Sequence, residues 1–148
     1  MTGSFTALAT VMIGGYVGHD VADHWVQTHT QATQKIEKDG ATHCLHHVIY
    51  LQFTKLGFVA LIWLVTGVHL NAWTLLLGAT IDALMHYAAD RQEFGILPKL
   101  AKLVNKTDFW EFGDKIIAPC GTGAYKMDQS WHVFWIFVWA LISSVGVN

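Results

Sequence analysis

The sequence has few charged residues and few cysteines for its length. Only 14% of its 148 residues are Asp, Glu, Lys or Arg, whereas a soluble domain averages about 25%. The net charge of −2 at pH 7 argues against a nucleic-acid-binding protein, which is usually strongly basic. The two cysteines, Cys44 and Cys120, form neither a CxxC pair nor a disulfide framework, so we expect free thiols.

Several common functional motifs are also missing from the sequence. It contains no GxSxG, no P-loop and no glycine motif for a dinucleotide. Cys120 has no defined base beside it, which favours an ordinary loop cysteine over a nucleophile. The first residues contain neither a basic n-region nor a small-residue cleavage site, so we expect the first apolar stretch to be retained as a helix.

Apolar residues are abundant, at 53% of the chain, and gather in four stretches. A membrane-spanning helix needs about 20 mostly apolar residues. With the polar residues at one end of each stretch included, we predict spans at about 5–27, 45–68, 70–90 and 129–147. The sequence thus predicts an all-α protein in which residues 1–148 form one integral membrane domain, a four-helix transmembrane bundle. The buried helices of a soluble bundle are the alternative.

The positions of lysine and arginine predict the orientation of this bundle. All of them except Lys55 lie in the connections between the first and second spans and between the third and fourth. Positive charge marks the cytoplasmic side, so we expect a multi-pass protein of the inner membrane with both termini outside and a long cytoplasmic loop at about 91–128. Apolar residues at helical spacing, flanked by lysines, predict a short amphipathic helix at 96–106, either on the inner leaflet or packed over the bundle mouth.

Histidines and aspartates gather at the predicted cytoplasmic end of every span. Residues four apart project from one side of a helix, about 6 Å apart along it. Histidine and carboxylate on facing helices of a bundle commonly form metal sites, and ionisable residues within spans are costly and usually functional. We therefore predict a metal site with these ligands: His19, Asp23, His47, His86, Asp90, Asp128 and His132.

Seven candidates exceed the four ligands of one tetrahedral zinc ion, so we expect one or two divalent ions. Imidazole with carboxylate favours zinc, with manganese or iron as alternatives. His46 adjoins His47 and could replace it as a ligand. We expect four other polar residues to lie at the surface or beside the ligands: Asp20, His24, His29 and His43.

Lys55 and Asp82 predict a second buried polar feature. Lys55 follows His47 by eight residues, which places it about 12 Å deeper in the bundle. Asp82 precedes Asp90 by eight residues on an antiparallel helix and so reaches a similar depth. Neither charge is stable alone in the interior, and we predict an ion pair. In the alternative, Lys55 reaches a lipid headgroup and Asp82 is a metal ligand.

Four segments, GHDVADHWVQTHTQATQK, HHVIY, MHYAADR and DQSWH, resemble a family of small membrane proteins, domain-of-unknown-function family 3307, frequent in phages, prophages and bacteria. The resemblance covers about Gly18 to His132. The chain departs from it by a long insertion between the third and fourth spans and by Asp20, His24 and Asp82. The family has no assigned activity, so it supports the site more than a function. The resemblance implies these site residues: His19, Asp23, Gln27, His47, His86, Asp90, Asp128, Gln129 and His132.

A fainter likeness suggests a chemistry. The pairs of histidine and aspartate four residues apart are similar to those of zinc-dependent phospholipases C and related nucleases. These enzymes place H-x3-D and H-x3-E pairs on bundled helices around clustered zinc. Such ions generate hydroxide near neutral pH and bind phosphoryl groups. Our leading hypothesis is a metal-dependent phosphoester hydrolase at the cytoplasmic face, with Asp128 as catalytic base and a lipid phosphate or nucleotide as substrate.

Two other functions remain open at this point. The same residues could pass a metal ion or a proton in a transporter or channel element. Alternatively, the chain could be a structural or interaction subunit of the membrane, phage-encoded, whose metal only holds the four helices together. A homo-oligomer or a larger membrane assembly fits all three hypotheses, and the sequence identifies no partner protein.

Overall fold

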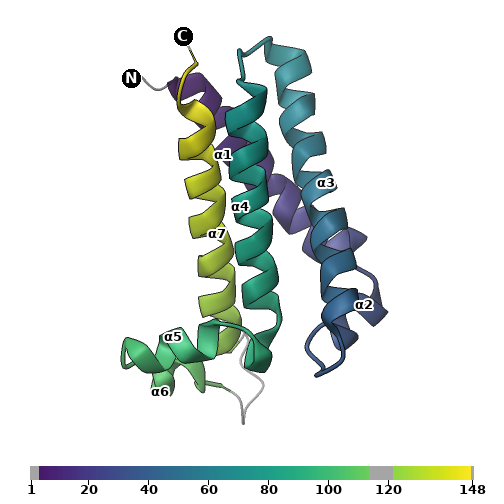
Figure 1. Ribbon diagram of the computed structural model, residues 1–148, viewed down its shortest axis with the longest axis vertical. Helices are drawn as coiled ribbons and strands as arrows, with labels where there is room; N and C mark the ends of the chain where they lie inside the picture. The colour runs from purple at the N-terminus through teal and green to yellow at the C-terminus, as the bar shows by residue number, and fades with distance from the viewer. Residues whose placement is uncertain (1–3, 114–121, 148) are drawn as a thin grey trace.

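The computed structural model describes residues 4–113 and 122–147. Within these residues there are seven α-helices, one π-helical segment, one 3₁₀ turn and no strand, which confirms the prediction of an all-α protein. There are four long helices with alternating directions, of which three lie side by side and the first crosses obliquely behind them (Figure 1). They are α1 (Phe5–Val21), α3 (Ala41–Thr66), α4 (Ala72–Asp90) and α7 (Gly123–Ser144).

The short elements gather at one end of the bundle (Figure 1). There α1 continues into a π-helical segment, Ala22–Val26, which is followed by α2 (His29–Gln34). At the opposite end, the backbone N–H of Ser4 donates to the carbonyl of Ser144 over 3.0 Å, so the start of α1 and the end of α7 lie together. Three further short elements join α4 to α7: the 3₁₀ turn Gln92–Phe94, α5 (Leu97–Leu103) and α6 (Thr107–Trp110).

Two long helices begin earlier than the predicted spans. α3 begins at Ala41, not at 45, and α7 begins at Gly123, not at 129. The hydroxyl of Thr122 accepts a hydrogen bond from the N–H of Tyr125 and caps α7, as threonine commonly does. The apolar pattern therefore located the long helices, and a threonine cap extends α7 into the polar residues that precede its apolar stretch. Cys120 lies outside the described residues, and Cys44 is a buried free thiol.

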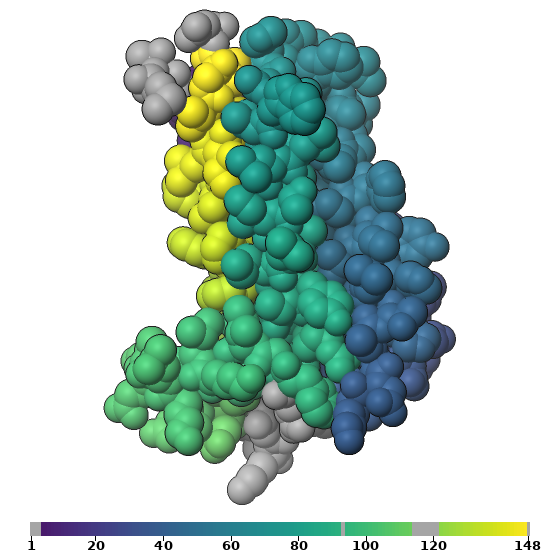
Figure 2. Space-filling model, viewed as in Figure 1, coloured from purple at the N-terminus to yellow at the C-terminus, as the bar shows by residue number. Residues whose placement is uncertain are grey.

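The predicted amphipathic helix is present as α5, at the end of the bundle where α4 ends and α7 begins (Figure 1). Leu97 and Ala101 are buried, whereas Leu103 and Val104 are exposed. The N–H of Ile96 donates to the carbonyl of Ala88 in α4 over 3.0 Å, which ties the start of α5 to the bundle. Figure 2 shows this region projecting sideways below α4 and α7. Its contact with the inner leaflet stays a prediction.

Glycines allow α1 to lie very close to α3. A Cβ atom on Gly18 would lie 2.6 Å from the Cα of Lys55, and one on Gly14 would lie 2.9 Å from the Cα of Val59. Small residues are the usual means by which helices approach at such a distance. Because His19 follows Gly18, the same approach holds the turn that carries His19 against α3.

Among the described helices, α3 alone is both long enough and apolar enough to cross a membrane, and most of it is exposed. α1 has 17 residues, and the polar ends of α4 and α7 carry the histidines and aspartates of the predicted site. Beyond those ends, the bundle interior holds an apolar core whose fully buried members are Val11, Val59, Ala79, Trp139 and Ala140.

Candidate metal centre

All seven predicted ligands converge inside the bundle, at the end where α2 and α5 lie. Each of the four long helices contributes one histidine, and the carboxylates come from the π-helical segment, α4 and α7. Their donor atoms form three overlapping groups, within each of which the atoms lie no more than 4.8 Å apart. These groups are His19, His86 and His132; Asp23, His47 and His86; and Asp90, Asp128 and His132.

Asp90 lies at the centre of this cluster. Its Oδ2 atom is 3.2 Å from Nε2 of His47 and 3.3 Å from Nε2 of His86. Its Oδ1 atom is 3.6 Å from Nε2 of His132. One buried carboxylate therefore faces imidazoles from α3, α4 and α7.

Asp23 brings the end of α1 to the cluster through the π-helical segment. Its Oδ2 atom lies 3.5 Å from Nε2 of His19, and its Oδ1 atom lies 3.3 Å from Nε2 of His47. A π-helical turn is rare and is frequently found at functional sites. Here it ends at Gln27, where the backbone becomes extended. The carboxylate thus lies between the first helix and α3.

Asp128 lies where the cluster meets a cavity. Its Oδ2 atom is 3.2 Å from Nε2 of His132, yet its side chain is 25% exposed. The cavity beside it has a volume of about 330 Å³ and is lined mainly by polar and aromatic residues: Gln92, Trp110, Thr122, Tyr125 and Asp128, with Ala89 and Ala124. A second cavity, of about 300 Å³, reaches His19 between Tyr16 and Gln129.

Several inward-facing atoms of the cluster lie 3.2–3.6 Å from a neighbouring side chain without forming a hydrogen bond among the described residues. They include Nε2 of His19, Oδ1 of Asp23 and Nε2 of His132. A buried polar atom left without a partner costs about 1–3 kcal/mol. The Nε2 atoms of His47 and His86 also face each other at 3.4 Å. A cation shared among these atoms would satisfy them, and nitrogen with carboxylate oxygen suits zinc, manganese or iron.

Lys35 is a component of the cluster that the sequence did not reveal. It follows α2, and its Nζ atom lies 2.9 Å from Oδ2 of Asp90. Burial lowers the pKa of Lys35, but the charge and hydrogen bond of Asp90, together with the charges of Asp23 and Asp128, raise it by more, so the pKa lies above its usual value and the amine stays protonated. The guanidinium of Arg91 donates to the carbonyls of Lys35 and Lys38 over 2.6 and 3.0 Å.

The structure separates the cluster from the other polar residues at this end. His46 is exposed and His47 is buried, so His47 is the residue that faces inward. Asp20 and His24 lie 3.5 Å apart on the exposed side of the first helix. His29 is exposed, and His43 is half-buried but belongs to none of the three donor groups.

The resemblance also implied two glutamines. Gln129 donates to Oδ2 of Asp128 over 3.4 Å, and Gln27 has a buried Nε2 atom without a partner among the described residues.

The predicted pair of Lys55 and Asp82 is confirmed. Nζ of Lys55 lies 2.5 Å from Oδ2 of Asp82, and both side chains are almost fully buried. The ring of Trp139 lies 5.7 Å from the ammonium. Asp82 is therefore engaged by Lys55 and belongs to none of the donor groups.

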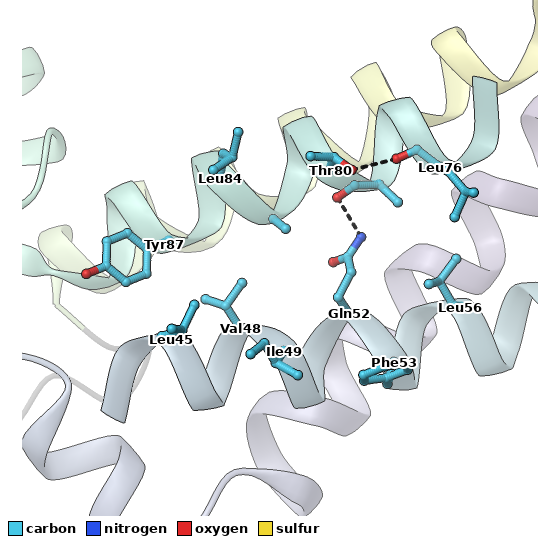
Figure 3. A pocket seen from close by; sticks show the side chains of 12 residues that line it. Leu45, Val48, Ile49, Gln52, Phe53, Leu56, Leu76, Thr80, Leu84 and Tyr87 are labelled. Carbon is cyan, nitrogen blue, oxygen red and sulfur yellow. Dashed lines mark hydrogen bonds between the residues drawn. The ribbon is translucent and has the colours of Figure 1, made fainter. Parts of the chain in front are cut away.

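A groove between α3 and α4 lies on the side of the bundle and is separate from the cluster. Its volume is about 520 Å³, and its walls are mostly apolar, with Val48, Phe53 and Leu84 among them (Figure 3). At its floor, the amide of Gln52 donates to the carbonyl of Ala79 over 2.9 Å and joins the two helices. The groove contains no member of the three donor groups.

The chain matches no protein-family model, no curated protein and no solved structure. The fold and the site together define an all-α protein with a buried His/Asp cluster that could hold a metal ion. The resemblance to family 3307 stays a prediction.

Proposed function

We propose that this protein is a membrane-embedded, metal-dependent hydrolase that acts on a phosphoester at the cytoplasmic face. One observation carries the proposal: four imidazoles and three carboxylates from all four long helices converge in a buried cluster with unsatisfied ligand atoms. This cluster adjoins a cavity at Asp128. Zinc is the favoured ion, with manganese and iron as alternatives.

The apolar exterior of the long helices supports a location in the bilayer. Large apolar side chains are exposed along all four helices, among them Phe5 and Ile13 of α1, Phe53 and Leu64 of α3, Leu77 and Leu84 of α4, and Phe134 and Leu141 of α7. Soluble monomers rarely expose apolar surface on this scale. Among the polar residues of α1, α4 and α7 are His19, His86, Asp90 and His132, which are buried at the cluster and not exposed on the outer surface.

Aromatic and basic residues support an orientation. Trp25 and Trp73, at opposite ends of the bundle, are 85% and 83% exposed, as expected for the two membrane interfaces. Lys99, Lys102 and Lys106 are exposed at the end that carries the cluster. Positive charge favours the cytoplasmic side, so we propose that this end is cytoplasmic and that both termini are outside.

The cluster offers the parts that phosphoester hydrolysis requires. A divalent ion bound there would polarise a phosphoryl oxygen and lower the pKa of water. Asp128 would accept a proton from the attacking water, because it is the carboxylate that faces both the cluster and the cavity. Since this end faces the inner leaflet and the cytoplasm, a lipid phosphate or a nucleotide is the substrate class we propose.

The hydrolase activity can be tested with three probes: p-nitrophenyl phosphate, its bis-ester and phosphatidic acid. The measured product is nitrophenol for the first two probes and phosphate for phosphatidic acid. Zinc-loaded protein in detergent should hydrolyse at least one of these probes, and chelation should abolish the activity. Asp128→Asn should lower the rate about 10²–10⁴-fold, as expected for a general base. Asp20→Asn, an exposed aspartate at the same end, is the control. Metal-loaded protein that hydrolyses none of the probes would contradict the proposal.

The membrane location has its own test. After alkaline carbonate extraction of cells that produce the full chain, the protein should stay in the membrane pellet. Its release into the supernatant would contradict a four-span bundle.

Burial of the cluster favours one alternative, a structural metal clamp. His47, His86 and His132 are each only 1% exposed, and an ion held by residues of all four helices would fix their packing. Bound metal without hydrolysis would support this function. Transport has less support, because in the described part of the chain an apolar core lies between the Lys55–Asp82 pair and the outer end of the bundle.

A further inference from the structure

We propose that the centre holds a single divalent ion and that the ammonium of Lys35 takes the place of a second one. This inference rests on the proposed metal centre and states its stoichiometry. The number of ligands does not decide that stoichiometry, because seven donors would suffice for two ions that share a carboxylate.

The position of the ammonium carries the proposal. Nζ of Lys35 lies 2.9 Å from Oδ2 of Asp90, the same oxygen that Nε2 of His47 and Nε2 of His86 approach to 3.2 and 3.3 Å. A cation thus already contacts the oxygen of Asp90 that these two imidazoles approach. The other oxygen, Oδ1, lies 3.6 Å from Nε2 of His132, and Asp90 forms a donor group with Asp128 and His132, so Oδ1 is available to the ion.

The loop that carries Lys35 is held in place. Arg91 is buried and donates to the carbonyls of Lys35 and Lys38. Gly40 has no space for a side chain, because a Cβ atom there would meet the carbonyl of Gln34 and lie 3.0 Å from the guanidinium of Arg91. A second metal ion would therefore have to displace an ammonium whose backbone is fixed on both sides.

The charges of the cluster agree with one ion. Metal-bound imidazoles are neutral, so the cluster has three negative carboxylates and one positive ammonium, which leave two negative charges. One divalent ion cancels these two charges. A second ion would leave two positive charges in a buried site with the ammonium in place, and one if it displaced the ammonium, which is costly in either case. This balance counts only the groups in direct contact within the cluster: Lys55 and Asp82 neutralise each other outside it, and the hydrogen bonds of Arg91 go to the carbonyls of Lys35 and Lys38.

Metal content after zinc loading and gel filtration tests the inference in the full chain. Wild type should hold one zinc per chain, and Lys35→Glu, which makes the net charge of the cluster two units more negative, should hold two. Lys35→Arg keeps the charge and should hold one. Lys38→Glu makes the same charge change at an exposed side chain of the same loop and should also hold one. In case Lys35→Glu does not fold, zinc titration of Lys35→Met should show a second binding step at least 10-fold tighter than any second step of wild type.

The outcomes separate this inference from the proposed function. Wild type with no zinc would overturn the metal centre and the inference together. Wild type with two zinc ions would overturn the inference and leave the metal centre standing. One zinc ion in wild type, with no second ion in Lys35→Glu or Lys35→Met, would show that Lys35 does not set the number of ions, which also overturns it.

Discussion

The bundle buries two polar regions that differ in one decisive respect. Lys55 and Asp82 form a closed pair with one charge of each sign and a direct hydrogen bond. The His/Asp cluster, one or two helical turns nearer the end where α2 and α5 lie, has more carboxylates than cations and ligand atoms without partners among the described residues. Burial of charge is common to both regions. A surplus of unsatisfied ligand atoms is what marks the cluster as a binding site.

Removing one member of the closed pair should have the largest effect. Lys55→Met leaves Asp82 buried without its partner, which costs about 3–5 kcal/mol. Thermal unfolding in detergent should show this loss, while the metal content stays as in wild type. The double variant Lys55→Met/Asp82→Leu should recover most of the stability, because neither charge is then left unpaired. A Lys55→Met variant as stable as wild type would refute the pair's role.

Gly18 lies next to both regions, against Lys55 and before His19. Its substitution should therefore affect both stability and metal binding, with a smaller loss of stability than Lys55→Met. In Gly18→Ala the new Cβ atom meets the backbone of Lys55 and pushes α1, with His19, away from α3. We expect a loss of about 1–3 kcal/mol, typical of overpacking, and weaker zinc binding in a titration. Gly57→Ala is the matched control, because among the described atoms nothing lies within 4 Å of its added Cβ. Equal behaviour of the two variants would contradict the close approach.

The exposed pair of Asp20 and His24 should give the smallest effect. It has the same four-residue spacing as His19 and Asp23, but it lies on the outer side of the helix. His24→Ala should change stability by no more than about 0.5 kcal/mol and leave the metal content unchanged. His19→Ala should lower the metal content. If the two variants lose metal equally, orientation does not distinguish ligands from surface residues here.

Much of the fold and of the cluster could be predicted because local spacing decides it. Apolar stretches located the four long helices, and a four-residue interval placed His86 with Asp90 and Asp128 with His132 on common sides. The depth of Lys55 and Asp82 followed from the rise of about 1.5 Å per residue on antiparallel helices. These inferences need only the geometry of single helices and their order.

The rest depends on contacts between distant segments. Lys35 stands in a loop, where no periodicity indicates its direction, and it reaches Asp90 because Arg91 holds that loop against α4. The choice of His47 over His46 depends on the rotation of α3, which its packing against Gly14 and Gly18 determines. The π-helical turn that positions Asp23 has no recognisable sequence pattern.

Elemental analysis of the detergent-purified protein tests the central claim most directly. Wild type should be compared with a His86→Ala, Asp90→Ala double variant, both prepared without chelators. The account predicts one equivalent of zinc, manganese or iron in wild type and its loss in the variant. Wild type without any divalent metal would contradict the account and favour a structural polar network or proton conduction instead.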